Sequence, residues 1–317
     1  LTEDGRRLAL TGPTNDLPIG KFRLEELTLP CQMFDDDDEK IRILTGCTNL
    51  KMLTLIQADL SAAAYENTIA TLTGLERFAQ HGGGVISDRG LKQLAKLQRL
   101  ESVKIIADLV TPEGIRELQR LPKLRELGIS GARVNAQLTR AIAQLQTVEN
   151  VSFHDVRIGE IDLESLKRLP RLTSLGITYS QKVRYGDDQL DEDHLAHLAG
   201  FSRLRSLNIG AAPVTDEWLR PVGSLNELTD LYLMKSSVTG GGLRFLSGAT
   251  KLNRLILSAS RIQDDGLRHI PTIDMLYSVY LRQTGITDTG LQHLHGWRSK
   301  HPNALYIDLR QTKVTAA

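Results

Sequence analysis

A hydrophobic motif recurs through almost the whole chain at a nearly constant interval. Apolar residues occupy its first, fourth and sixth positions, as in Leu228, Leu231 and Leu233. Twelve copies can be aligned, and their first positions are Leu24, Leu50, Leu75, Leu100, Leu124, Val148, Leu172, Leu204, Leu228, Leu252, Leu276 and Ala304. Successive copies begin 24 to 28 residues apart, except for one interval of 32 residues after Leu172. A period of this length predicts a solenoid, in which each unit buries its apolar face against its neighbours.

Each unit has the pattern of a strand, a turn and a short helix. The alternating apolar residues predict a strand with one buried face. A hydroxyl residue followed by Asp, as in Thr287-Asp288, favours a helix start, because the hydroxyl caps free amide groups and the carboxylate suits the helix dipole. Parallel strands lie about 4.8 Å apart whereas packed helices need about 8–10 Å, so the sheet is expected on the concave side.

Two segments carry a resemblance to a known family. Residues 228–239 read LTDLYLMKSSVT, and residues 281–291 read LRQTGITDTGL. They resemble bacterial leucine-rich repeat proteins and are similar to the ribonuclease-inhibitor and F-box-associated repeat class. The resemblance covers nearly the entire chain. It implies an α/β leucine-rich repeat solenoid, a right-handed horseshoe with a parallel sheet on the concave face and short helices on the convex face, that serves as an interaction module.

The sequence predicts two regions of unequal length. Residues 1–23 are expected to form a degenerate N-terminal repeat or cap, with a worn-down strand at Leu8 and Leu10. Residues 24–317 are expected to form the solenoid of about twelve units, with an enlarged unit at 172–203. Insertions in solenoids emerge as loops on one face, often the binding face, so the extra residues of this unit are a candidate contact segment.

The ninth position of the units departs from the Asn or Cys that is usual in this family. It holds mostly small residues, namely Ala58, Ala132, Ser180, Ala212, Ser236, Ser260, Thr284 and Thr312. A hydroxyl can satisfy a buried backbone group in place of an Asn amide, whereas the methyl group of Ala cannot. We therefore expect a less regular hydrogen-bond ladder at this position.

Residues between the apolar motif positions are expected to face the concave surface. Tyr and Arg dominate the energetics of protein interfaces, because they combine large area with directed hydrogen bonds. The candidate partner-binding residues are Tyr232, Lys235, Tyr280, Arg282, Tyr306 and Arg310 on the strands, with Tyr179, Arg184 and Tyr185 in the enlarged unit. Tyr232 and Tyr280 are expected roughly 10 Å apart, with Arg282 on the same face. The alternative is ordinary solvated strand decoration beside a tolerated loop, since Tyr is also a good strand former.

Charge and composition argue against several other classes. The 39 basic and 38 acidic residues give a net charge of +1, so no overall field favours nucleic acid. No apolar stretch approaches the roughly 20 residues of a membrane-spanning helix. Cys31 and Cys47 are too few for a disulfide scaffold. The acidic run at 35–39 is explained by a helix start rather than a calcium site, and the histidines show no ligand spacing, so no metal or cofactor is expected.

No sequence pattern indicates a catalytic centre. The three glycines at 82–84 lack the Lys-Ser/Thr that completes a phosphate-binding loop. Ser152, His154 and Asp155 cannot form a triad from one strand, because neighbouring side chains there point to opposite faces. The chain is therefore expected not to be an enzyme.

These observations predict a non-catalytic protein-binding scaffold that uses the concave sheet, and a place within a larger complex is compatible with them. Two alternatives remain: a structural subunit or recognition domain of an assembly whose active part lies outside this sequence, and a glycan-binding receptor module that uses the same Tyr-rich strip. No Cys-rich flanking caps of the extracellular animal type occur, and the segment from Trp297 to Tyr306 resembles the closing repeat of bacterial members. A bacterial cytoplasmic or cell-envelope location is therefore favoured over an extracellular one.

Overall fold

A computed structural model describes residues 24–30, 37–82, 84–131, 133–179, 196–211 and 214–315. The chain divides into two compact units, the first formed by residues 1–133 with 140–148 and the second by residues 134–139 with 149–317. The expected cap at 1–23, and Arg184 and Tyr185 of the enlarged unit, lie outside the described residues. The division into a cap and a single solenoid therefore stays a prediction.

Strands and short helices alternate through the first unit. In chain order its elements are β1 (Glu26–Pro30), α1 (Asp37–Ile41), η3 (Arg42–Leu44), β2 (Met52–Ile56), α2 (Ala62–Asn67), η4 (Ile69–Thr71), β3 (Arg77–His81), α3 (Asp88–Leu94), β4 (Ser102–Ile106), α4 (Pro112–Glu117), η5 (Leu118–Arg120) and β5 (Glu126–Ser130), where η marks a 3₁₀ helix. Helix α5 (Ala136–Ile142) contributes residues to both units.

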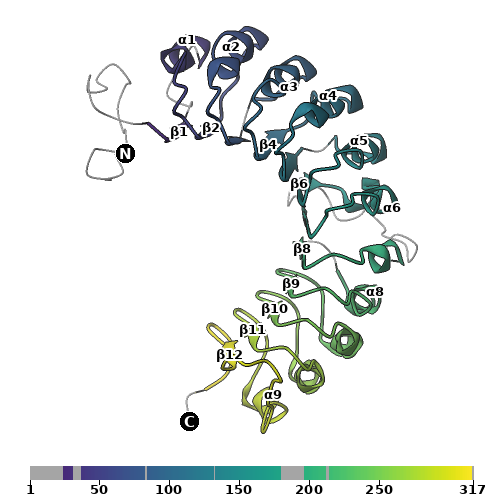
Figure 1. Cartoon of the computed structure of the whole chain (residues 1–317). Coiled ribbons are helices and arrows are strands. Elements are labelled where there is room, and N and C mark those ends of the chain that lie inside the picture. Colours follow the sequence, from purple (N-terminus) through teal and green to yellow (C-terminus); the bar gives the residue numbers. More distant parts are fainter. Residues whose placement is uncertain are drawn as a thin grey trace. The chain divides into compact units, whose positions relative to one another are not determined.

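The second unit continues the same alternation. Its elements are β6 (Asn150–Val156), η6 (Ile158–Glu160), α6 (Leu163–Leu166), β7 (Ser174–Tyr179), η7 (His197–Gly200), β8 (Ser206–Gly210), η8 (Asp216–Trp218), α8 (Leu219–Val222), β9 (Asp230–Tyr232), η9 (Gly241–Gly248), β10 (Arg254–Ile256), η10 (Asp264–Thr272), β11 (Ser278–Tyr280), α9 (Asp288–Gln292) and β12 (Tyr306–Asp308). Within each unit the strands lie side by side on one face, here called the strand face, and the helices lie on the opposite side (Figure 1).

Parallel pairing follows the sequence repeat, with a register shift at the end of β6 between His154 and Val156. In the first unit Phe78 is aligned with Leu53, and in the second unit Leu255 is aligned with both Leu231 and Val279. These residues are the fourth positions of their motifs, and all of them are completely buried. The expected parallel sheet with flanking short helices is confirmed.

Hydrogen bonds between successive repeats join the starts of their helices. Asp264 accepts from the backbone amide of Thr287 (2.8 Å) and from its Oγ1 (2.6 Å) in the next unit. Asp88 binds Thr111 in the same two-pronged way, at 2.9 and 2.7 Å, and so does Asp288 with Thr315. Comparable pairs join Asp38 to Ser61 and Asp216 to Thr239. We call this arrangement the Asp–Thr staple, including its one Ser member.

Three hydroxyl residues of the staple, Ser61, Thr111 and Thr287, also cap their own helices, as the sequence predicts. Thr287 Oγ1 accepts from the amide of Thr289 at the start of α9, and Thr111 Oγ1 accepts from the amide of Glu113 in α4. One hydroxyl therefore closes a helix end while it donates to the carboxylate of the preceding unit. The sequence pattern predicts the Asp at the helix start, but its bond to the next repeat has no local sequence signal.

The ninth-position hydrogen-bond ladder is irregular, as the sequence predicts. Thr284 Oγ1 donates to the carbonyl of Leu281 (2.6 Å), and Thr312 Oγ1 donates to the carbonyl of Leu309 (2.7 Å). These two bonds confirm that a hydroxyl can replace the usual amide. Ser236 and Ser260 differ, because their buried Oγ atoms have no hydrogen-bond partner among the described residues. The two serines reach the core but do not contribute to the ladder.

Candidate partner-binding surface

The strand face of the second unit carries two rows of outward-facing residues on β9 to β12. The first row consists of Asp230, Arg254, Ser278 and Tyr306, and the second consists of Tyr232, Ile256, Tyr280 and Asp308. Beyond the strand ends, the same face continues with Lys235, Arg282 and Arg310. We use the name aromatic–arginine surface for Tyr232, Lys235, Arg254, Ile256, Tyr280, Arg282, Tyr306, Asp308 and Arg310. It contains all six of the strand residues that the sequence proposes as partner-binding.

Tyr232 and Tyr280 lie in the same row two strands apart, as the sequence predicts, and the direct aromatic contact is between Tyr280 and Tyr306. The rings of Tyr280 and Tyr306 lie 5.3 Å apart between centroids and are tilted by 51°. Tyr232 is separated from Tyr280 in the register by Ile256 on the intervening strand. Tyr306 is exposed, whereas Tyr232 and Tyr280 are half-buried. The aromatic contact therefore forms at β11 and β12, and Ile256 fills the place between the other two tyrosines.

Arg254 occupies the strand between Tyr232 and Tyr280. Its Nη1 lies 3.2 Å from Asp230 Oδ1 on β9. A hydrogen bond with Tyr232 and the charge of Asp230 raise the pKa of Arg254. The guanidinium is therefore held beside the tyrosines before any partner arrives. This residue belongs with the partner-binding candidates, and its place in the same exposed register as Asp230 was the signal available in the sequence.

Asp308 and Arg310 form a fixed pair at the end of the surface. The carboxylate accepts from Arg310 Nε (2.9 Å) and Nη2 (2.6 Å), and also from the Arg310 backbone amide (3.1 Å). These hydrogen bonds from Arg310, with its positive charge, lower the pKa of Asp308 to about 2. Asp308 is nearly inaccessible to solvent, while the Arg310 side chain stays exposed. The pair presents the arginine outward and hides the acid.

Arg282 and Lys235 present positive charge without a carboxylate partner. Arg282 Nε donates to Gln311 Oε1 at 2.9 Å, a neutral acceptor. Among the described residues neither Arg282 nor Lys235 forms an ion pair, and both side chains are exposed. Their charge is available to a binding partner.

The remaining strands of the second unit carry smaller side chains at the same two rows. On β6, β7 and β8 the equivalents are Asn150, Ser152, Ser174, Gly176, Ser206 and Asn208. His154 on β6 contacts Thr178 on β7, with 2.7 Å between Nδ1 and Oγ1. Tyr179 is the last residue of β7, and its side chain lies outside the described part of the chain. The bulky aromatic and arginine residues are thus concentrated on β9 to β12.

The strand face of the first unit is different, because its charged residues neutralise each other. Lys104 lies 2.8 Å from Glu126 on the next strand, and Ser102 Oγ donates to the same carboxylate at 2.8 Å. Arg77 lies 3.3 Å from Glu26. This face presents paired charge and no tyrosine on its described strands.

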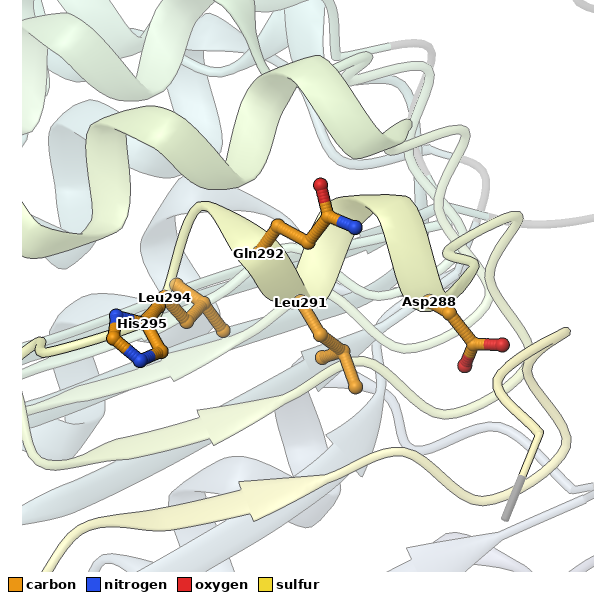
Figure 2. Close-up of a pocket in the computed structure, with 5 residues that line it drawn as sticks. All are labelled: Asp288, Leu291, Gln292, Leu294 and His295. Atoms are coloured by element: carbon orange, nitrogen blue, oxygen red, sulfur yellow. The ribbon is translucent and has the colours of Figure 1, made fainter. Parts of the chain in front are cut away.

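A shallow hollow of about 570 Å³ lies along α9 on the helix side of the second unit. Figure 2 shows its lining residues Asp288, Leu291, Gln292, Leu294 and His295. Leu291 and Leu294 are half-buried here, although Leu267 and Ile270 at the same repeat positions of η10 are completely buried. The hollow therefore exposes apolar positions that are covered, in the preceding repeat, by the helix of the next repeat.

The described part of the chain shows no assembled metal site. No group of three or more His, Cys, Asp or Glu side chains among these residues has the geometry to hold a metal ion. None of the helices in the described ranges has the length and apolar character needed to cross a bilayer.

Parallel strands that each lead into a short helix, repeated every 24 to 28 residues, define a leucine-rich repeat fold. The chain resembles a solved yeast Rad7 and Elc1 complex, with a TM-score of 0.56, 19% identity and coverage of 85% of this chain and 71% of that one. An internalin, inlF from Listeria monocytogenes, matches with a TM-score of 0.44, 19% identity and coverage of 84% and 89%. The plant peptide hormone receptor RGFR1 in complex with RGF2 matches with a TM-score of 0.45, 15% identity and coverage of 92% and 43%. No family model and no curated protein matches the sequence.

Proposed function

We propose that this chain is a non-catalytic scaffold that binds another protein through the aromatic–arginine surface. The observation that carries the proposal is the concentration of three tyrosines and three arginines on four adjacent strands of one unit. Tyr and Arg are the residue types most enriched at binding hot spots. If these residues were distributed by chance, the neighbouring strands would carry them too. Strands β6 to β8 instead carry small side chains at the same two rows.

The surface is also organised before binding. Arg254 is held by Tyr232 and Asp230, Arg310 is held by Asp308, and Tyr280 packs against Tyr306. Side chains that are already ordered lose less conformational entropy when a partner docks. Strand residues held in this way supply a more precise site than residues on a free loop.

The remaining parts of the proposal concern the setting of the protein. The resemblance of the repeat sequence to bacterial members supports a bacterial origin and a cytoplasmic or cell-envelope location. A repeat scaffold without catalytic groups suits a place in a larger complex, where it positions another subunit. A glycan ligand would use the same tyrosines, and the experiment below separates the two.

Affinity capture from the native source, followed by mass spectrometry and a binding measurement with the captured partner, tests the proposal. The double change Tyr232→Ala with Arg282→Ala is expected to weaken binding by about 2 kcal/mol or more while leaving the circular dichroism spectrum and the unfolding midpoint nearly unchanged. Arg99→Ala is the control, because Arg99 is exposed in the first unit and away from the strand face. Recovery of only sugars or lipids, or an unchanged affinity in the double variant, would overturn the proposal.

A further inference from the structure

The charges of the aromatic–arginine surface do not balance. It contains four cationic side chains, Lys235, Arg254, Arg282 and Arg310, while the two acids on its rows are Asp230 and Asp308. Both acids are already engaged, Asp230 by Arg254 and Asp308 by Arg310. The surplus charge therefore belongs to Arg282 and Lys235, and to the exposed side of Arg310.

The surplus cations lie along one side of the tyrosines. Arg282 and Arg310 occupy the same repeat position in successive units, and the amide of Gln283 donates to the carbonyl of Arg310 at 3.1 Å. The amide of Ala259 donates to the carbonyl of Arg282 (2.8 Å), and the amide of Lys235 donates to the carbonyl of Ser258 (3.0 Å). These bonds join the four successive repeats just beyond the ends of β9 to β12. Arg282 and Arg310 are therefore neighbours, and Lys235 lies towards β9, separated from Arg282 by Ser258 and Ala259 of the intervening repeat.

We propose that the aromatic–arginine surface binds an extended acidic segment of a protein partner, laid across β9 to β12. Carboxylates of the segment pair with Arg282 and Arg310, and Lys235 adds positive charge at the β9 end, while the alternate apolar side chains contact Ile256 and the flanking tyrosines. An extended chain suits this arrangement, because its successive side chains point to opposite sides. This inference rests on the proposed function and specifies the chemistry of the partner.

The dimensions of the surface match a short segment. Four adjacent strands span three spacings of about 4.8 Å, or roughly 14 Å, which an extended chain covers with about four to five residues. A four-residue segment with two acidic and two apolar side chains presents one carboxylate for each of the exposed cations Arg282 and Arg310, with Lys235 at the β9 end of the surface. Arginine forks pair carboxylates with two parallel hydrogen bonds, which favours a carboxylate over a neutral group.

The test uses the full chain and two fluorescein-labelled peptides, an eight-residue peptide of alternating Glu and Leu and its counterpart of alternating Lys and Leu. Fluorescence anisotropy is expected to show binding of the Glu peptide, weakened by added salt, and no comparable binding of the Lys peptide. The double change Arg282→Gln with Lys235→Gln is expected to weaken binding of the Glu peptide about tenfold and to reduce its salt dependence. Arg99→Gln, which removes an exposed arginine of the first unit, is expected to leave the affinity unchanged.

Three results would overturn the inference: equal affinity for the two peptides, an unchanged affinity in the double Gln variant, or tighter binding of a labelled single-stranded oligothymidine than of the Glu peptide. The proposed function is judged separately by the captured native partner. If the Tyr232→Ala and Arg282→Ala variant loses the native partner but the parent protein does not bind the Glu peptide, the acidic-segment inference is refuted and the proposed scaffold function stands. Retention of the native partner by the same variant would refute the proposed surface itself.

Discussion

Glycines at the helix starts permit neighbouring units to approach closely. A Cβ at Gly114 would lie 2.1 Å from Asp88 Oδ1, and a Cβ at Gly290 would lie 2.4 Å from Asp264 Oδ1. Both carboxylates are members of the Asp–Thr staple. The glycine therefore leaves room for the carboxylate that bonds the threonine three residues earlier, so residue size and hydrogen bonding are coupled at these two junctions.

Two adjacent glycines of η9 separate this packing effect from helix propensity. A Cβ at Gly242 would lie 2.3 Å from the backbone oxygen of Asp216, whereas the atom nearest to a Cβ at Gly241 is 3.6 Å away. Gly242→Ala is therefore expected to lower the free energy of unfolding by about 1–3 kcal/mol through overpacking. Gly241→Ala is expected to be neutral or stabilising by up to about 1 kcal/mol. Urea denaturation of both variants measures the difference, and equal effects would contradict the close approach.

The buried acid Asp308 gives the surface a dependence on pH. Its folded-state pKa of about 2 lies below the ordinary value of 3.8, so its pairing with Arg310 stabilises the fold above about pH 4. That contribution is lost as the pH falls from about 4 through 2, because the carboxyl group takes up a proton. Asp308→Asn is therefore expected to destabilise the protein at pH 6 and to make much less difference near pH 2. Unfolding midpoints at the two pH values, compared with the parent protein, provide the check; an equal deficit at both would argue against the depressed pKa.

Sequence reasoning reached some single-residue features and missed others. The apolar positions and the helix caps follow from residue type and spacing, and Leu231, Leu255 and Thr287 lie where the pattern places them. The eighth position is different, because most of its residues have φ between 55° and 59° without being glycine: Gln57, Asp155, Ala211, Lys235, Ala259, Gln283 and Gln311. Their side chains share no chemical property, so the left-handed backbone is imposed by the repeat geometry rather than signalled locally.

Equivalent residues on successive helices differ in solvent exposure, because the neighbouring repeat covers one helix and not the other. Leu267 in η10 is fully buried, whereas Leu291 at the same repeat position in α9 is half-buried and lines the hollow of Figure 2. The two leucines have the same side chain in the same local pattern, Asp-x-Gly-Leu. Their difference in burial therefore reflects the neighbouring unit alone, which a local sequence pattern does not encode.

This pair of leucines permits a direct comparison. Leu267→Ala is expected to lower the free energy of unfolding by about 2–5 kcal/mol, because it removes a buried side chain and leaves a cavity. Leu291→Ala removes a partly solvated side chain and is expected to cost about 1 kcal/mol. Guanidinium denaturation distinguishes these values. A cost for Leu291→Ala as large as that for Leu267→Ala would mean that the hollow along α9 is covered in solution.

For the molecule as a whole, the period of the sequence was sufficient to predict the class of fold but not the binding surface. The parallel strands and their register follow from the repeat, since each unit buries its motif against the next. The surface depended on which side chains meet across strands. Spacing alone placed Tyr232 and Tyr280 two strands apart in one row, as the structure has them, but it did not indicate that Ile256 lies between them or that Tyr280 packs against Tyr306. Ring orientation and ion pairing lie beyond a periodic pattern.

Packing between neighbouring repeats also determines how far the destabilisation caused by a core substitution spreads. Leu255→Ala opens the core between β9 and β11, and the loss is expected to be felt first by units that contact it. Hydrogen exchange followed by mass spectrometry is expected to show lower protection in β9, β10 and β11 and little change in β2, β3 and β4. A uniform loss of protection along the whole chain would instead indicate that the repeats unfold as one cooperative body.

The Asp–Thr staple also bears on how such a chain can grow. Residues 276–303 contain both halves of the staple, since Thr287 receives Asp264 from the preceding unit and Asp288 reaches Thr315 in the following one. A tandem duplication of this segment in the gene would place the first copy of Asp288 opposite the second copy of Thr287. Every carboxylate and every hydroxyl would again have its counterpart. The residues that form the bond between repeats are therefore copied together with the repeat. The protein can lengthen by duplication without new mutations at the junction.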